Sequence, residues 1–249
     1  ERKGLILCQK IRFSDSLGGG TSSETSLNPK GYRITGTTTS NTIKVEPEVT
    51  TDIMLDNVSV TSSGTKNCMD VSHANVTITL VGNNLLSCGA TAYGALVKDG
   101  MDDSRLIIQC EHADEKGHTC SEGTCGKLRA EGTVEHATAI GNIIANRTVK
   151  EESRFSNLTI KGGIVNAQAG EHNCAIDAAC GSYANGGTDT KQYAENIRIE
   201  GGIITAKGGN PLRRHRRRKG NSGRRNLYYG RNSLCVRREI FSRHRVRWC

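Results

Sequence analysis

The sequence has few prolines and few aromatic residues: three prolines in 249 residues, with Phe, Trp and Tyr together at 4%. It also lacks an initiating Met, a signal-peptide pattern and any apolar run long enough to span a membrane, which indicates an internal fragment of a longer protein. The Leu, Ala, Glu and Lys enrichment of helical bundles is missing. Glycine is abundant, with 29 copies, and a glycine-rich chain with small and aliphatic apolar residues is typical of a turn-rich all-β fold.

Positive charge is confined to one end of the chain. Residues 211–249 contain thirteen Arg and one Lys against one acid, Glu239, which gives a charge of +13. The whole chain carries +9, so residues 1–210 carry −4. A mildly acidic body gives no reason to expect a nucleic-acid partner, and the basic end needs a separate explanation.

The sequence contains internal repeats between residues 126 and 209. Residues 157–170 read NLTIKGGIVNAQAG and residues 196–209 read NIRIEGGIITAKGG, 39 residues apart and without a gap. GKLRAEG (126–132) matches the second half of this unit, and HATAIG (136–141) matches HNCAID (172–177). Such self-similarity is typical of repeat architectures in which stacked units share one core.

Within each unit, apolar and polar residues alternate, which predicts short strands with one apolar face. Stacking the units would place equivalent side chains over one another. We therefore expect three columns in the core: Leu128, Val165 and Ile204; Ala130, Ala167 and Ala206; Ile140 and Ile176.

Corner residues recur between these strands. Gly162-Gly163 and Gly201-Gly202 permit a sharp bend with positive φ. Asn75, Asn157 and Asn196 each precede a strand; Asn tolerates the left-handed conformation and can stack as a ladder. Units of three brief strands favour a right-handed parallel β-helix over residues 31–210, with the hand expected from parallel crossovers. Residues 1–30 remain unassigned.

Several motifs resemble one known family. GYRITGTTTSNTIKV (31–45), DIMLDNVSV (52–60) and VTITLVGNNLL (76–86), followed by the repeats in the same order, are similar to bacterial carbohydrate-binding-domain proteins built as pectate-lyase-like β-helices. The resemblance covers about residues 31–210. It implies extracellular or cell-wall display by anaerobic Gram-positive bacteria. It also implies non-catalytic binding of plant-type or acidic polysaccharide by a monomeric part of a surface protein.

The basic tail interrupts this pattern where another Gly-rich stretch such as AGIGGG is expected. Reading each codon of Arg213–Arg218 one base later can convert RRHRRR into AGIGGG, and the same shift can convert residues 226–235 into IYITGGTVSA. We therefore predict that residues 211–249 are a frameshifted, disordered translation of further repeats. A basic arm that binds DNA in a salt-sensitive way is the alternative.

The densest constellation of reactive side chains is CEHADEKGHTCSEGTC (110–125). It contains five metal-ligand side chains within sixteen residues: Cys110, His112, His118, Cys120 and Cys125. Zinc needs about four such ligands in a tetrahedral array. A small disulfide loop between Cys120 and Cys125, or free thiols on an ordinary loop, are the alternatives.

Other candidate residues are explained as well by an ordinary structural role as by a ligand-binding one. Asp99, Asp102 and Asp103 suit a calcium site or a solvated turn. Four cysteines fall in or beside the repeats and suit small buried core positions: Cys68, Cys88, Cys174 and Cys180.

For sugar binding, the repeat region offers Tyr93, Tyr183 and Tyr193, which we expect in loops where exposed aromatics bind ligands. The paired carboxylates of glycoside hydrolysis and the calcium-and-base pattern of lyases are missing, so enzyme activity is not expected. A structural stalk or adhesin without a small ligand is the second interpretation, and a polysaccharide lyase the third.

Overall fold

The computed structural model describes residues 11–14, 31–98, 103–143, 153–171, 173–178 and 192–209. This part of the chain is all-β and contains no helix, as its composition predicts. The predicted basic tail, residues 211–249, and most of residues 1–30 lie outside the described residues.

Sixteen strands are described, most of them four to eight residues long. In chain order they are β1 (Ile11–Ser14), β2 (Tyr32–Thr38), β3 (Thr42–Val45), β4 (Thr50–Ser63), β5 (Met69–Asp70), β6 (Asn75–Val81), β7 (Asn83–Gly89), β8 (Gly94–Val97), β9 (Leu106–Cys110), β10 (Lys127–Gly132), β11 (Thr138–Gly141), β12 (Ser153–Ile160), β13 (Ile164–Gln168), β14 (Ile176–Asp177), β15 (Gln192–Ile199) and β16 (Ile203–Lys207).

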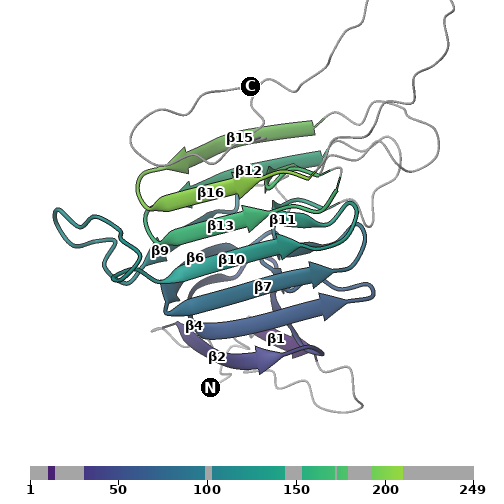
Figure 1. Cartoon of the computed structure of the whole chain (residues 1–249), viewed down its shortest axis with the longest axis horizontal. Helices are drawn as coiled ribbons and strands as arrows, with labels where there is room; N and C mark the ends of the chain where they lie inside the picture. The colour runs from purple at the N-terminus through teal and green to yellow at the C-terminus, as the bar shows by residue number, and fades with distance from the viewer. Residues whose placement is uncertain are drawn as a thin grey trace, which may run out of the picture.

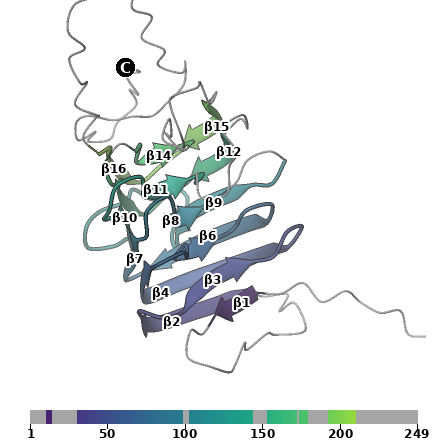
Figure 2. The same ribbon diagram turned by 90° about the vertical axis from the view of Figure 1, so that its right-hand side faces the viewer.

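The strands form two sheets, which run alongside each other from the N-terminal to the C-terminal end of the described structure (Figures 1 and 2). The smaller sheet has the order β1-β3-β5-β8-β11-β14, and the larger has the order β15-β12-β9-β6-β4-β7-β10-β13-β16, with β2 beside β4. The pairing of β1 with β3 is antiparallel, and the others are parallel.

The long strand β4 explains why the larger sheet curls. Its residues 50–56 pair with β6, whereas its residues 59–63 pair with β7. Asn57, between the two halves, has a left-handed backbone with φ 53°, which turns the strand there. The bend divides the larger sheet into two halves, so that β6 and β7 lie in different halves and β8 lies in the smaller sheet. The next three strands follow the same order: β9 pairs with β6, β10 with β7 and β11 with β8, which gives three stacks of parallel strands.

The predicted core columns are confirmed by the strand register. Leu128 pairs with Val165 and Val165 with Ile204. Ala130, Ala167 and Ala206 are aligned in the same two pairings, and Ile140 is the partner of Ile176. All eight side chains are buried, so equivalent side chains of successive strands lie next to one another in the interior and extend one shared core.

The corners follow the sequence prediction in part. Gly163 and Gly202 have φ of 96° and 93°, as their place in the repeat predicts. Asn157 and Asn196 are both left-handed, and the side-chain amide of Asn196 donates to the Asn157 oxygen at 2.6 Å. The prediction for Asn75 is wrong in its conformation: this residue begins β6 without a positive φ, and its side chain accepts the backbone N–H of Arg105 at 3.1 Å.

The interior between the stacks is aliphatic, with a few small and polar exceptions. Cys68, Cys88 and Cys174 are buried, as predicted for small core residues, while Cys180 lies outside the described residues. Asn84 is buried at 3% exposure and joins three strands: it accepts the N–H of Val58 at 2.9 Å and donates to the carbonyls of Val81 and Lys127 at 3.0 Å each.

Candidate metal centre

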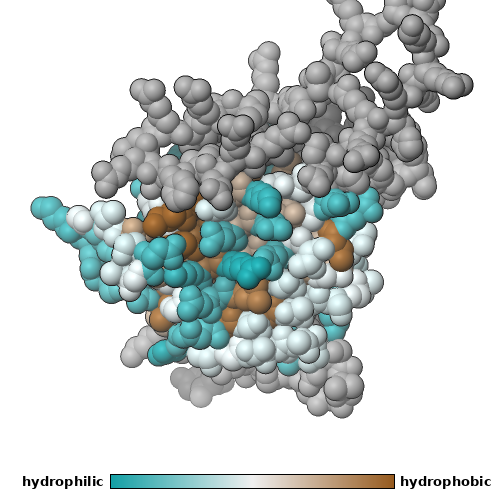
Figure 3. Space-filling view, viewed as in Figure 1, coloured by the Kyte–Doolittle hydropathy of each residue, from teal (hydrophilic) through white to brown (hydrophobic). Residues whose placement is uncertain are grey.

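A loop of sixteen residues, 111–126, leaves the stack between β9 and β10 and projects from its side (Figure 1). The hydrophilic surface of the molecule continues over this projection (Figure 3). Its backbone folds by short local turns, in which the N–H groups of Ala113, Glu115 and His118 bond to carbonyls three residues earlier. The local turns set the shape of the loop, but its position on the stack depends on other contacts.

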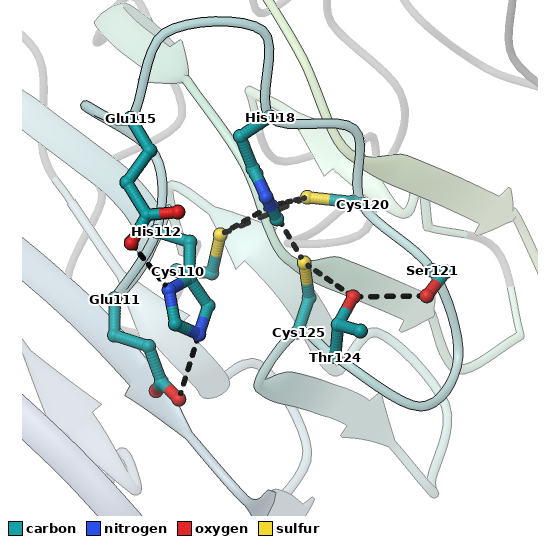
Figure 4. A network of polar contacts seen from close by, with 9 residues as sticks. All are labelled: Cys110, Glu111, His112, Glu115, His118, Cys120, Ser121, Thr124 and Cys125. Atoms are coloured by element: carbon teal, nitrogen blue, oxygen red, sulfur yellow. Dashed lines mark hydrogen bonds and ion pairs between the residues drawn. The ribbon is translucent and has the colours of Figure 1, made fainter.

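Those contacts come from four side chains that converge at the base of the loop (Figure 4). Cys110 ends β9, His118 and Cys120 lie on the returning segment, and Cys125 comes just before β10. One possible ligand atom from each lies within 4.8 Å of all the others. The sequence named five candidates at this place; the structure brings together four and leaves out His112.

The distances within this Cys110–His118–Cys120–Cys125 cluster resemble the edges of a tetrahedron. Sγ of Cys110 lies 3.7 Å from Sγ of Cys120, and Nε2 of His118 lies 3.6 Å from each of these sulfurs. For Zn–S of about 2.3 Å and Zn–N of about 2.0–2.1 Å, tetrahedral edges are about 3.8 Å and about 3.6 Å. The remaining contact measured, from His118 to Cys125, is shorter at 3.1 Å, as expected for a direct hydrogen bond.

The cluster is sheltered from solvent on its inner side. Cys110 and Cys125 are buried together with Ile164, and Ala113, Cys120 and Ile203 pack around them. The backbone N–H of Gly163, at the corner before β13, donates to Sγ of Cys120 at 3.1 Å. An N–H donor aimed at a sulfur stabilises its thiolate form and is a typical outer-shell contact of a metal-bound cysteine.

Gly162 adds a second, steric relation to the cluster. A Cβ built on Gly162 would lie 3.0 Å from Sγ of Cys110, so no larger residue fits without displacing the sulfur. The sequence suggested only that this glycine pair makes a corner. Its contact with Cys110, 52 positions away, carries no sequence signal, and the matching Gly201-Gly202 pair instead approaches the backbone of Lys161 and Gly163.

The three thiols differ in acidity. Burial raises the pKa of Cys110, and burial with hydrogen bonding to Cys125 raises the pKa of Cys120 to about 12. Burial also acts to raise the pKa of Cys125, but hydrogen bonds with Cys120 and His118 outweigh it and lower that pKa to about 7. A thiolate therefore forms most readily at Cys125.

His112 has other partners. Its Nδ1 lies 2.8 Å from a carboxylate oxygen of Glu115, and its Nε2 lies 3.5 Å from Glu111. The hydrogen bond with Glu115 raises the pKa of His112. The centroids of the His112 and His118 rings lie 5.4 Å apart, and His112 contributes no ligand atom to the cluster.

The disulfide alternative is absent from the described part of the chain, where all six cysteines are free thiols. The cluster therefore has the donor set of a metal site: three thiols and one imidazole.

Beside the loop, the outer face of the larger sheet carries a polar groove of about 670 Å³. Aligned positions on β4, β6 and β9 form it, with Asp52 beside Thr77 and Thr79 beside Gln109. Arg33 and Tyr32 of β2 lie at one end of this stack, and Asp114 of the loop and Lys161 lie at the other. Met54 and Ile107 give it two apolar surfaces.

Of the three tyrosines predicted from the sequence, Tyr93 is the one whose side chain the structure describes, and it does not line this groove. Tyr93 is half-buried and packs against the core, Tyr193 falls in β15, and Tyr183 lies outside the described residues. Tyr32 lines the groove although it, like Tyr93, is partly buried against the core; the sequence prediction covered loop tyrosines, whereas Tyr32 begins β2. Of the calcium candidates, Asp103 is exposed, and Asp99 and Asp102 lie outside the described residues.

Comparisons with protein-family models, with curated proteins and with solved structures found no match. The resemblance noted from the motifs therefore remains a prediction. Among the described residues there is no helix with the length and apolar character needed to cross a membrane.

Proposed function

We propose that residues 31–209 form a right-handed parallel β-helix that binds one Zn²⁺ through Cys110, His118, Cys120 and Cys125. The observation that carries the zinc proposal is that these four ligand atoms lie within 4.8 Å of one another, with the three separations among Cys110, His118 and Cys120 close to tetrahedral edges. The β-helix is supported by the three stacks of parallel strands and by the register of the repeats.

The donor set favours zinc over the harder cations. Calcium and magnesium take oxygen ligands, whereas thiolates and imidazole suit zinc. Four protein ligands leave no open position for water or substrate, which is typical of structural rather than catalytic zinc. Zinc would be held by the three cysteines as thiolates and by the neutral imidazole of His118, and its binding would stabilise the closed form of the loop.

The test is the metal content of the purified chain, measured by inductively coupled plasma mass spectrometry after dialysis against zinc. We expect one zinc per chain. The variants Cys120→Ser and Cys125→Ser should lose most of it, whereas His112→Ala, in the same loop but outside the cluster, should keep it. Cobalt substitution should give the visible and charge-transfer bands of a tetrahedral thiolate site. Equal zinc loss in His112→Ala, or no zinc in the unaltered chain, would contradict the proposal.

A second candidate function is the binding of polysaccharide, and the polar groove favours it. Its hydroxyl, amide and charged side chains suit a hydroxyl-rich polymer, and the partly buried Tyr32 lines one end. The chain would then be a non-catalytic module of an extracellular surface protein; the alternative remains a stalk or adhesin without ligand. Affinity electrophoresis in gels with neutral or acidic glycans distinguishes these, since a stalk is retarded in none. Release of unsaturated products that absorb ultraviolet light would instead reveal a lyase.

A further inference from the structure

We infer that the metal centre holds one end of the polar groove in shape, so that zinc binding and polysaccharide binding are linked. This inference rests on both proposals above and joins them. It follows from where the groove residues lie relative to the cluster.

Three groove residues lie next to parts of the cluster in the chain. Gln109 immediately precedes the ligand Cys110, and Asp114 lies between the ligands Cys110 and His118. Lys161 immediately precedes Gly162 and Gly163, which contact the sulfurs of Cys110 and Cys120. One end of the groove is therefore built from residues that the cluster fixes in place.

The loop that carries Asp114 is fastened to the stack mainly by the cluster itself. Its apolar contacts centre on Cys110, Cys120 and Cys125, packed against Ile164 and Ile203. Around these ligands, most loop side chains between residues 111 and 124 are exposed. A loop with few buried apolar contacts opens at low free-energy cost. The metal would supply the missing stabilisation, because its binding energy depends on the closed arrangement of all four ligands.

The charges of the groove point to a neutral polymer. Arg33 and Lys161 are balanced by Asp52 and Asp114, so the groove presents no excess of either sign. Between its ends lie the hydroxyls and amide of Thr77, Thr79 and Gln109, with the Gln109 amide donating to the Thr79 hydroxyl at 3.4 Å. Such groups pair with sugar hydroxyls without requiring a charged partner.

The effect of each ligand on the affinity for the other must be reciprocal. If zinc raises the affinity for the polysaccharide by some factor, the polysaccharide must raise the affinity for zinc by the same factor. We expect a factor of about five or more, at the lower end of typical coupling between sites.

The experiment compares zinc-loaded and chelator-treated protein. Retardation is measured in gels with a neutral mixed-linkage β-glucan or with polygalacturonate, for the unaltered chain, Cys120→Ser, His112→Ala and Asp114→Asn. Hydrogen–deuterium exchange of β9 and residues 161–163 is followed in parallel without glycan. A chelator competition then measures zinc affinity with and without the retarding glycan.

We expect the neutral glycan to retard the zinc-loaded chain and His112→Ala. Chelated protein and Cys120→Ser should bind it about fivefold or more weakly and exchange faster at β9 and residues 161–163. Asp114→Asn should keep zinc and lose glycan affinity. Equal retardation and exchange with and without zinc would overturn the linkage while leaving zinc binding intact. Absence of zinc would overturn the metal proposal. Retardation by polygalacturonate alone, or by neither glycan, would overturn the assignment of the groove.

Discussion

The backbone N–H of Gly163 donates a hydrogen bond to Sγ of Cys120 at 3.1 Å, although the two residues are 43 positions apart. The bond joins the loop after β9 to the corner between β12 and β13, one layer further along the stack. The cluster therefore lies between successive layers and ties them together, which is why residues at that corner should affect metal affinity although they provide no ligand.

The first prediction concerns Gly162. In Gly162→Ala the new Cβ would lie 3.0 Å from Sγ of Cys110, so the sulfur must move. We expect zinc affinity to fall about tenfold, in the range found when outer-shell contacts of metal sites are removed. A competition titration against a zinc-binding dye measures this.

Gly123→Ala is the matched control for Gly162→Ala. Gly123 lies in the same loop, and a Cβ built on it meets nothing within 4 Å. Its zinc affinity should equal that of the unaltered chain. The same loss in both variants would show that the loop tolerates no alanine, rather than that Gly162 makes room for the Cys110 sulfur.

The second prediction concerns protons released by the thiols on metal binding. At pH 8, Cys110 and Cys120 hold their protons because their pKa values are raised, whereas Cys125, with a pKa of about 7, is largely ionised. Zinc should therefore displace about two thiol protons at pH 8 and about three below pH 7, since the ligands bind as thiolates. Zinc affinity should accordingly weaken as pH falls, and more steeply below pH 7.

Calorimetric titration in buffers of different ionisation enthalpy measures this proton release. Cys125→Ser provides the comparison: any zinc that it still binds at millimolar concentration should release a number of thiol protons that does not rise between pH 8 and pH 6.5. A rise of the same size as in the unaltered chain would assign the acidic thiol to another residue.

The third prediction concerns His112, whose pKa is raised by the hydrogen bond with Glu115, while the pKa of Glu115 is lowered by the same bond. The stabilisation due to His112 is present below its unfolded pKa and lost as pH rises through its folded pKa. That due to Glu115 is present above its unfolded pKa and lost as pH falls through its folded pKa. The pair is therefore formed between the two folded values.

Glu115→Gln should lower the pKa of His112 and leave zinc content unchanged. An NMR titration of the His112 ring proton measures the first effect, and metal analysis the second. Loss of zinc in Glu115→Gln would mean that His112 and Glu115 support the cluster after all.

The sequence predicted the stacking well because stacking depends on a repeating pattern. Val165 and Ile204 occupy the same place in units 39 residues apart, and a parallel register sets them over each other. The candidate ligands were likewise visible as a dense group, since four of the five lie in one short loop. The choice among them depended on which histidine faces inward, and spacing alone does not determine that.

What the sequence missed depends on contacts between separate units. Gly162-Gly163 and Gly201-Gly202 look alike in the repeat, yet only the first pair meets sulfur atoms, because only the first follows a unit with the inserted loop. The groove was missed for a similar reason. Its residues come from the outward positions of β4, β6 and β9, and no single segment shows that Asp52, Thr77 and Ile107 are neighbours.

The fourth prediction concerns Asn84, the buried amide that joins β4, β6 and β10. Asn84→Ala would leave the N–H of Val58 and the carbonyls of Val81 and Lys127 without their side-chain partner. An unsatisfied buried polar group costs about 1–3 kcal/mol, so we expect the free energy of unfolding to fall by about 3 kcal/mol. Urea unfolding of the zinc-saturated protein, followed by circular dichroism, measures this change.

Asn83→Ala is the control, because Asn83 is the same residue type on the same strand with its side chain in solvent. Exposed substitutions of this kind change stability by less than about 0.5 kcal/mol. A loss of stability of similar size in both variants would show that Asn83 and Asn84 act through the β-strand propensity of asparagine in β7 rather than through the buried hydrogen bonds of Asn84. A loss confined to Asn84→Ala would show that one buried side chain holds the two halves of the curled sheet together where they part at β4.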